Sequence, residues 1–106
     1  MTTILGQKIR ALRQEKQLTL EELATETGSS KSYMWELENK PAARPSAEKI
    51  AKIAKVLGVT LEYLMSEQNL PPTASELDEA FFHRYQTLDT ETKEKLTRIL
   101  DVLDKE

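Results

Sequence analysis

The sequence predicts an all-α protein of seven helices. Apolar residues recur three or four positions apart in successive segments, as they do on the buried face of an amphipathic helix. Ser, Thr or Asp precedes each segment, and glycine or proline ends several of them, which is typical of helix boundaries. We see no internal repeat and no strand pattern. The 106 residues are enough for one compact domain with an appended element.

The first two helices are indicated by spacing and by capping residues. Leucine and isoleucine recur at helical spacing over residues 5–16, which predicts the first helix. Thr19 is a suitable N-cap for the second, and Glu22 three residues later completes a capping box. Gly28 is expected to end the second helix, because glycine tolerates the left-handed conformation found just after a helix.

Three further helices are expected before residue 66, each preceded by a hydroxyl side chain that can accept a hydrogen bond from a free N–H. They cover residues 31–39 after Ser29 or Ser30, residues 47–57 after Ser46, and residues 61–65 after Thr60. Pro41 and Pro45 prevent the third helix from running into the fourth.

A linker and two more helices complete the chain. Pro71 and Pro72 favour extended backbone, which indicates a linker. The predicted division is a domain of residues 1–66, a linker of residues 67–75 and a C-terminal element of residues 76–106. The helices expected in that element cover about residues 76–87 after Ser75, and about residues 90–105 after Asp89 or Thr90.

Charge differs between the two parts of the chain. Residues 1–65 carry ten Lys/Arg and eight Asp/Glu, a net charge of +2, whereas residues 66–106 carry five and ten, a net charge of −5. Binding to phosphate needs local positive charge and not a basic whole chain. The total charge of −3 therefore does not exclude a nucleic-acid partner.

Several classes of protein are disfavoured. The chain has no cysteine, which excludes disulfides and thiolate metal sites. No apolar run approaches the ~20 residues that span a bilayer, and the N-terminus lacks a signal-peptide core. We therefore expect a cytoplasmic protein. His83, the single histidine, is interpreted as structural or solvent-facing and not as a metal ligand or base. With no cysteine and no phosphate-binding glycine loop either, we predict no metal, no cofactor and no enzymatic activity.

Residues 19–39 contain two short helices that meet at a tight turn with one glycine. In this arrangement the second helix can enter the major groove of DNA while the first crosses the backbone. Met34 and Leu37 of the second helix are expected to face inward. Its outward side chains can read base edges, since Lys donates to guanine, Glu accepts from cytosine and Ser does either. They are Lys31, Ser32, Trp35, Glu36 and Asn39.

The segment from Leu5 to Met65 resembles the lambda repressor/Cro family of helix-turn-helix regulators, also called the xenobiotic-response-element family. The resemblance rests on LTLEELA, the glycine turn, SSKSYMWELEN and PSAEKIAKIAKVLGVTLEYLM, in that order and spacing. It implies a five-helix DNA-binding domain whose third helix enters the major groove. Carried over by position, the base contacts are Ser30, Lys31, Ser32 and Glu36, with Trp35 on the same face, and the phosphate contacts are Asn39, Lys40 and Arg44.

The resemblance also implies a structural ion pair between Arg13 and Glu38. One position departs from the family pattern. Members often carry a glutamine that contacts phosphate where this chain has Leu20, although backbone amides at a helix N-terminus can still serve. The interpretation of Trp35 stays open between contact with a sugar or thymine methyl and packing against the following loop.

The two C-terminal helices lie outside the resemblance, and we expect them to form a dimer interface. One small domain reads only a few base pairs, so two half-sites supply useful affinity. The same apolar residues could instead fold back on the core of their own subunit. They are Leu77, Phe81, Tyr85, Leu88, Leu96, Ile99 and Leu103.

The leading functional prediction is a homodimeric transcriptional repressor. It would bind a palindromic operator in double-stranded DNA through residues 31–39. The alternative is a DNA-binding antitoxin of a toxin–antitoxin pair, whose C-terminal helices would bind a partner protein. No membrane partner is predicted.

Overall fold

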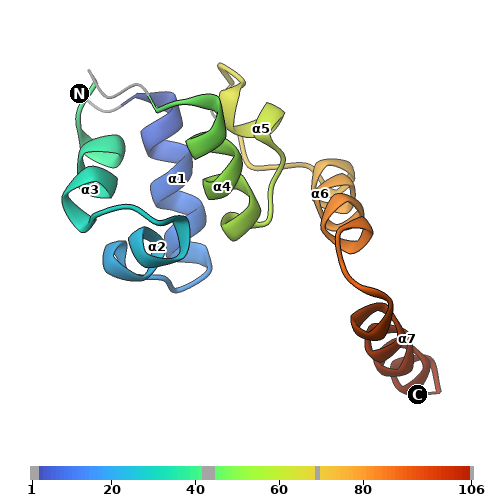
Figure 1. Ribbon diagram of the computed structural model, residues 1–106. Helices are drawn as coiled ribbons and strands as arrows, with labels where there is room; N and C mark the ends of the chain where they lie inside the picture. The colour runs from blue at the N-terminus through green and yellow to red at the C-terminus, as the bar shows by residue number, and fades with distance from the viewer. Residues whose placement is uncertain (1–2, 42–44, 69, 106) are drawn as a thin grey trace.

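The computed structural model describes residues 3–41, 45–68 and 70–105. Within these ranges the chain forms seven α-helices and no strand, which confirms the predicted all-α class. The helices are α1 (Ile4–Glu15), α2 (Leu20–Thr27), α3 (Lys31–Asn39), α4 (Ala47–Leu57), α5 (Leu61–Met65), α6 (Ala74–Gln86) and α7 (Thr90–Asp104) (Figure 1). None of the helices described is long and apolar enough to cross a membrane.

Helices α1–α5 surround one core built mainly from leucine, isoleucine and alanine, with a methionine, a valine and a tyrosine. Its fully buried members come from every one of these helices, for example Ile9, Leu23, Met34, Ile53 and Leu64. Burying such side chains supplies about 1.5–3 kcal/mol each, so this core explains why the five helices form one unit. The unit holds α2 and α3 in fixed positions relative to α1 and α4.

The predicted N-caps account for most helix starts. The capping box of α2 is present, since Thr19 Oγ1 accepts the Glu22 N–H at 3.0 Å and Glu22 Oε1 accepts the Thr19 N–H at 2.9 Å. Ser30, and not Ser29, caps α3, and Asp89, and not Thr90, caps α7. Each cap satisfies one of the backbone N–H groups that a helix start leaves free.

The start of α6 corrects the sequence-based prediction. This helix begins at Ala74, and its N-cap is Thr73 and not Ser75. Thr73 Oγ1 accepts the Glu76 N–H at 3.1 Å, and Glu76 Oε1 accepts the Thr73 N–H at 3.0 Å. Ser75 was wrong because residues 73–76 form a capping box, which satisfies two N–H groups at once. The predicted linker therefore loses its last residues to α6.

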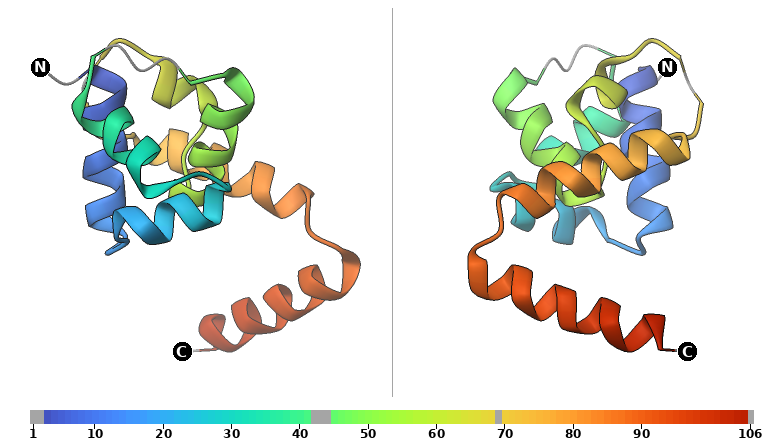
Figure 2. Two further views of the ribbon diagram at one scale, coloured as in Figure 1. Left: turned by 60° about the vertical axis from the view of Figure 1, so that its left-hand side comes forward. Right: turned by 90° about the vertical axis from the view of Figure 1, so that its right-hand side faces the viewer.

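Helices α6 and α7 are placed differently from the others. Helix α6 lies beside α4 and α5, whereas α7 projects away from the five-helix unit (Figures 1 and 2). Neither helix has a buried residue, although both carry large apolar side chains. The exposed ones are Leu77, Phe81, Phe82, Ile99, Leu100, Val102 and Leu103, while Tyr85, Leu88 and Leu96 are partly buried.

Candidate nucleic-acid interface

Helices α2 and α3 meet at the turn that follows Gly28. Gly28 has a φ of 69°, which a glycine adopts without steric cost. The Ser29 N–H donates to the Ala24 carbonyl oxygen at 2.8 Å and closes the turn. Ala24 is buried, and its small side chain lets the two helices pack closely. The predicted helix-turn-helix is therefore present.

Helix α3 divides into a buried and an exposed face. Met34 and Leu37 are buried in the core, as the spacing predicted. On the opposite side, four exposed side chains line a shallow hollow of about 340 Å³, which we call the α3 hollow. They are Lys31, Ser32, Trp35 and Glu36. The structure thus brings together four of the five residues that the sequence assigned to base contact.

The remaining candidates lie around this hollow. The Ser30 hydroxyl oxygen accepts the Tyr33 N–H at 3.0 Å, so it caps α3 and can still donate its own proton. At the other end of the helix, Asn39 Nδ2 donates to the Trp35 carbonyl oxygen at 2.9 Å. Lys40 Nζ lies 5.9 Å from the centroid of the Trp35 ring, within the range of a cation–π contact. Arg44 lies outside the described residues.

An ion pair joins α3 to α1. Arg13 Nε donates to Glu38 Oε2 at 2.7 Å, and Arg13 Nη2 donates to Glu38 Oε1 at 3.0 Å. The side chains are 13% and 2% exposed. Arg13 Nη1 also donates to the Leu18 carbonyl oxygen at 2.9 Å. A planar guanidinium that satisfies both carboxylate oxygens fixes the orientation of α3 against the scaffold.

Gly6 permits a second close contact between these helices. A Cβ atom at this position would lie 2.5 Å from the Leu37 carbonyl oxygen and 2.9 Å from that of Glu38. Only glycine fits, because any side chain would force α1 and the end of α3 apart. The sequence-based reading overlooked Gly6, since nothing in a helical stretch marks a glycine that faces a neighbouring backbone.

Lys49 fixes the turn itself from α4. Its ammonium group donates to the Ser29 hydroxyl oxygen at 2.6 Å and lies 5.8 Å from the centroid of the Tyr33 ring. Leu20, where the family often has a phosphate-binding glutamine, is partly buried and packs against the core. Its side chain therefore contributes apolar contact to the fold.

Lys8 is a buried cation that the sequence-based reading missed. Its Nζ donates to the Tyr63 carbonyl oxygen at 2.7 Å, the Ser66 carbonyl oxygen at 2.8 Å and the Ser66 hydroxyl oxygen at 2.9 Å. Burial lowers the pKa of Lys8 while the carboxylate of Glu76 opposes the shift. Lys8 follows Leu5 by three positions and so lies on the apolar face of α1. This position was the feature of the sequence that could have indicated its burial.

Tyr63 extends this contact toward α6. Its hydroxyl donates to the Leu70 carbonyl oxygen, and its ring lies 4.5 Å from Lys8 Nζ. Burial raises the pKa of Tyr63, and the negative charges of Glu76 and Glu15 raise it further. Lys8 and Tyr63 together attach the segment that leads to α6 to the five-helix unit.

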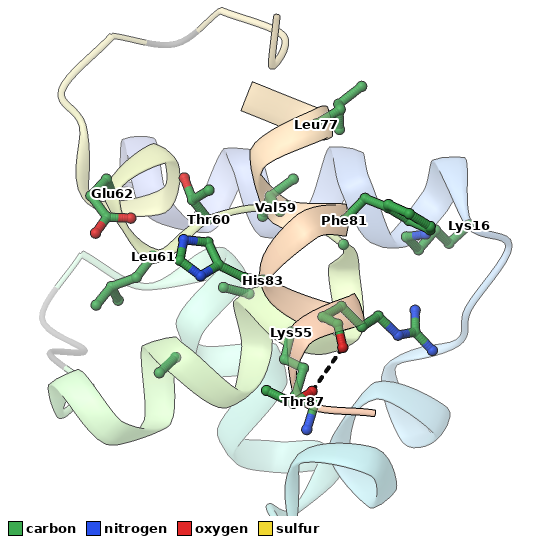
Figure 3. A pocket seen from close by; sticks show the side chains of 15 residues that line it. Lys16, Lys55, Val59, Thr60, Leu61, Glu62, Leu77, Phe81, His83 and Thr87 are labelled. Atoms are coloured by element: carbon green, nitrogen blue, oxygen red, sulfur yellow. Dashed lines mark hydrogen bonds between the residues drawn. The ribbon is translucent and has the colours of Figure 1, made fainter. Parts of the chain in front are cut away.

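A second hollow, of about 520 Å³, lies between α6 and the α4–α5 region (Figure 3), and we call it the α6 hollow. Leu77 and Phe81 of α6 form part of its apolar wall. Its cationic lining residues are Lys16, Lys55 and Arg84. Leu77 is 43% exposed and Phe81 is 58% exposed, so the chain itself leaves this wall largely uncovered.

Comparison with known proteins identifies the family. A model of the Helix-turn-helix family matches residues 9–64, which include α2, α3 and the turn between them. The chain belongs to this family. The resemblance to Cro-like regulators is thereby confirmed.

Similar proteins are regulators of transcription. The HTH-type transcriptional regulator SinR of Bacillus subtilis is 33% identical over 75 residues, covering 71% of this chain and 68% of SinR. The HTH-type transcriptional repressor RghR of the same organism is 38% identical over 60 residues, covering 57% of this chain and 44% of RghR. The antitoxin alternative receives no support from these comparisons.

A solved structure supports the same assignment. One matching crystal structure is that of SinR, described as the master regulator for biofilm formation, in complex with DNA. SinR in that structure is 35% identical in sequence to this chain. The match has a TM-score of 0.55 and covers 58% of this chain and 98% of that one. It is similar to this chain in sequence as well as in fold.

Proposed function

We propose that the protein is a homodimeric transcriptional repressor that binds a palindromic operator with α3 in the major groove. The α3 hollow is the observation that carries this proposal. It gathers an ammonium group, a hydroxyl, an indole and a carboxylate on the exposed face of the second helix of a helix-turn-helix. DNA is the proposed ligand because SinR, a similar protein, has been solved in complex with DNA. Repression is proposed because RghR is a repressor.

Each side chain of the surface has a proposed partner. Lys31 donates to guanine O6 or N7, Glu36 accepts from cytosine N4, and Ser30 and Ser32 bond to neighbouring edges. Trp35 supplies apolar contact. Phosphates are bound by Asn39, Lys40 and Arg44, and by backbone amides at the start of α2.

Rigid support of α3 makes such reading effective. The Arg13–Glu38 pair, the close approach at Gly6 and the Lys49 contact hold both ends of α3 and its preceding turn. A recognition surface whose backbone is already fixed loses little conformational freedom when it binds. We infer that the residues making these contacts hold α3 in position for DNA and do not contact DNA themselves.

The C-terminal helices are the proposed dimer interface. A contiguous apolar surface that one chain leaves exposed marks an association site. Leu77 and Phe81 leave such a surface exposed at the α6 hollow, and α7 carries further exposed apolar side chains. A second copy would cover it and place two α3 helices on half-sites about one helical turn apart.

Selection from a library of random duplexes by the full chain tests this function. We expect an enriched inverted repeat with half-sites about 10 base pairs apart, centre to centre. The same selection is carried out in parallel with Lys31→Ala. This variant should lose the sequence preference at one position of each half-site. Failure to enrich any sequence would contradict sequence-specific binding. A single, unrepeated half-site would contradict the homodimer alone.

A further inference from the structure

The α3 hollow has an apolar wall that hydrogen-bond readout does not use. Lys31 and Ser32 stand in the first turn of α3, and Trp35 and Glu36 follow one turn later. Helical side chains lean toward the N-terminus, which places the Trp35 indole over the turn of Lys31 and Ser32. The small Ser32 side chain leaves space beside the indole.

A cation lies near the Trp35 ring. Lys40 Nζ lies 5.9 Å from the centroid of its ring. The Trp35 carbonyl oxygen accepts from Asn39, which ties the end of α3 to this residue. The side chain nevertheless remains 47% exposed, which is unusual for an indole. Trp35 lines the α3 hollow, so exposed indole surface borders it.

We propose that the α3 hollow receives the C5 methyl group of a thymine and that Trp35 is the residue that selects it. This inference rests on the proposed function. The thymine methyl is the apolar group that base edges present in the major groove. An apolar indole flanked by the Lys31 ammonium and the Glu36 carboxylate fits a methyl next to polar base edges. The hollow is shallow and open, so the adjoining edge of the pyrimidine can approach it.

Deoxyuridine tests the proposal, because it lacks only the methyl and keeps the hydrogen-bonding edges of thymine. The probe is the duplex enriched by the full chain, with each thymine replaced singly. For the unmodified protein we expect one thymine in each half-site at which this change raises Kd about fourfold, as expected for one buried methyl. In Trp35→Ala the same change should leave Kd nearly unaltered.

Lys40→Ala is the matched control, since it removes the cation beside the ring and keeps the indole. It should bind all duplexes more weakly yet retain the same response to deoxyuridine. Trp35→Leu, which keeps an apolar side chain, should retain part of that response. It keeps the test decisive if the alanine variant does not fold. The inference is overturned if no thymine responds, or if the response persists in Trp35→Ala. Loss of all enrichment would contradict the proposed function too, whereas an enriched duplex without a methyl response contradicts this inference alone.

Discussion

Glu38 is a buried residue that supports the helix carrying the candidate DNA contacts. Its carboxylate is 2% exposed and lies at the end of the helix that carries the candidate contacts. A carboxylate at such a site stays charged at low cost only when both oxygens have donors. Arg13 supplies both, so this residue of α1 contributes directly to the position of α3.

Arg13→Ala should lower the free energy of unfolding by about 3–5 kcal/mol, because it leaves the Glu38 charge buried without its partner. Urea unfolding followed by circular dichroism measures this. Lys52→Ala is the control, since Lys52 forms an exposed pair with Glu48 at 3.6 Å. It should change stability by less than about 1 kcal/mol. Equal small effects of both substitutions would argue against a structural role for Arg13.

Lys31→Ala should weaken binding to the enriched duplex by about 1–3 kcal/mol, or about 5- to 150-fold. The melting temperature should hardly change, because Lys31 is exposed. Equilibrium titration and thermal unfolding measure the two effects. Lys52→Ala, an exposed lysine on α4, is the control and should leave affinity intact. Unchanged affinity in Lys31→Ala would remove Lys31 from the contacts.

Single residues were predicted unevenly from the sequence. Lys31, Ser32 and Glu36 follow from helical spacing, which places them opposite the apolar residues of α3. The burial of Lys8 does not follow from spacing alone, because its acceptors come from residues 63–66, far along the chain. Such contacts depend on tertiary packing that residue type cannot reveal.

At the scale of the element, helix boundaries depend on which side chain completes a cap. The sequence predicted the caps of α2, α4 and α5, where one candidate precedes each apolar segment. It failed at α6, where two hydroxyl residues compete and the reciprocal pair of Thr73 and Glu76 prevails. At α6 the second hydrogen bond of the capping box distinguishes Thr73 from Ser75.

Helix α7 should respond to acid through its N-cap. Asp89 Oδ1 accepts the Thr92 N–H at 2.7 Å, and hydrogen bonding with Thr92 lowers the pKa of Asp89. A lowered pKa means that the cap stabilises the helix above the ordinary value of 3.8 and fails as pH falls below it. Circular dichroism of the unmodified chain and of Asp89→Asn, which caps without titrating, measures this.

The unmodified chain should lose more helix than Asp89→Asn as pH falls below about 3.8. The other carboxylates titrate in both proteins, so the difference between the two curves isolates the cap of α7. Superimposable acid titrations would show that the Asp89 charge contributes nothing to this helix.

At the scale of the whole molecule, the chain combines a packed five-helix unit with two helices, α6 and α7, that have no buried residue. From the proline pair and the extent of the family resemblance, the sequence predicted a domain of residues 1–66, a linker and a C-terminal element, and this division stays a prediction. The sequence did not predict that α6 would lie beside α4 and α5, or that the α6 hollow would form there. Such placement depends on contacts between distant residues, which local patterns do not specify.

Truncation should separate the two parts if the cut preserves the anchoring contacts. Ser66 accepts from Lys8 and Leu70 accepts from Tyr63, so a chain ending at Pro72 keeps both contacts and one ending at Met65 loses both. The Pro72 truncation should be folded, monomeric and weak in DNA binding, while the full chain sediments as a dimer. The Met65 truncation should melt at a lower temperature. A Pro72 truncation that stayed dimeric would rule out α6 and α7 as the interface.

Contact between α3 and DNA can be observed directly, because Trp35 is the single tryptophan of the chain and is 47% exposed at the α3 hollow. Its fluorescence, and its accessibility to acrylamide, are measured while the enriched duplex is added. We expect the emission to change and the accessibility to fall at the same duplex concentration that shifts the protein in a gel. A gel shift with unchanged Trp35 emission and unchanged accessibility would mean that DNA binds elsewhere and that α3 does not read it.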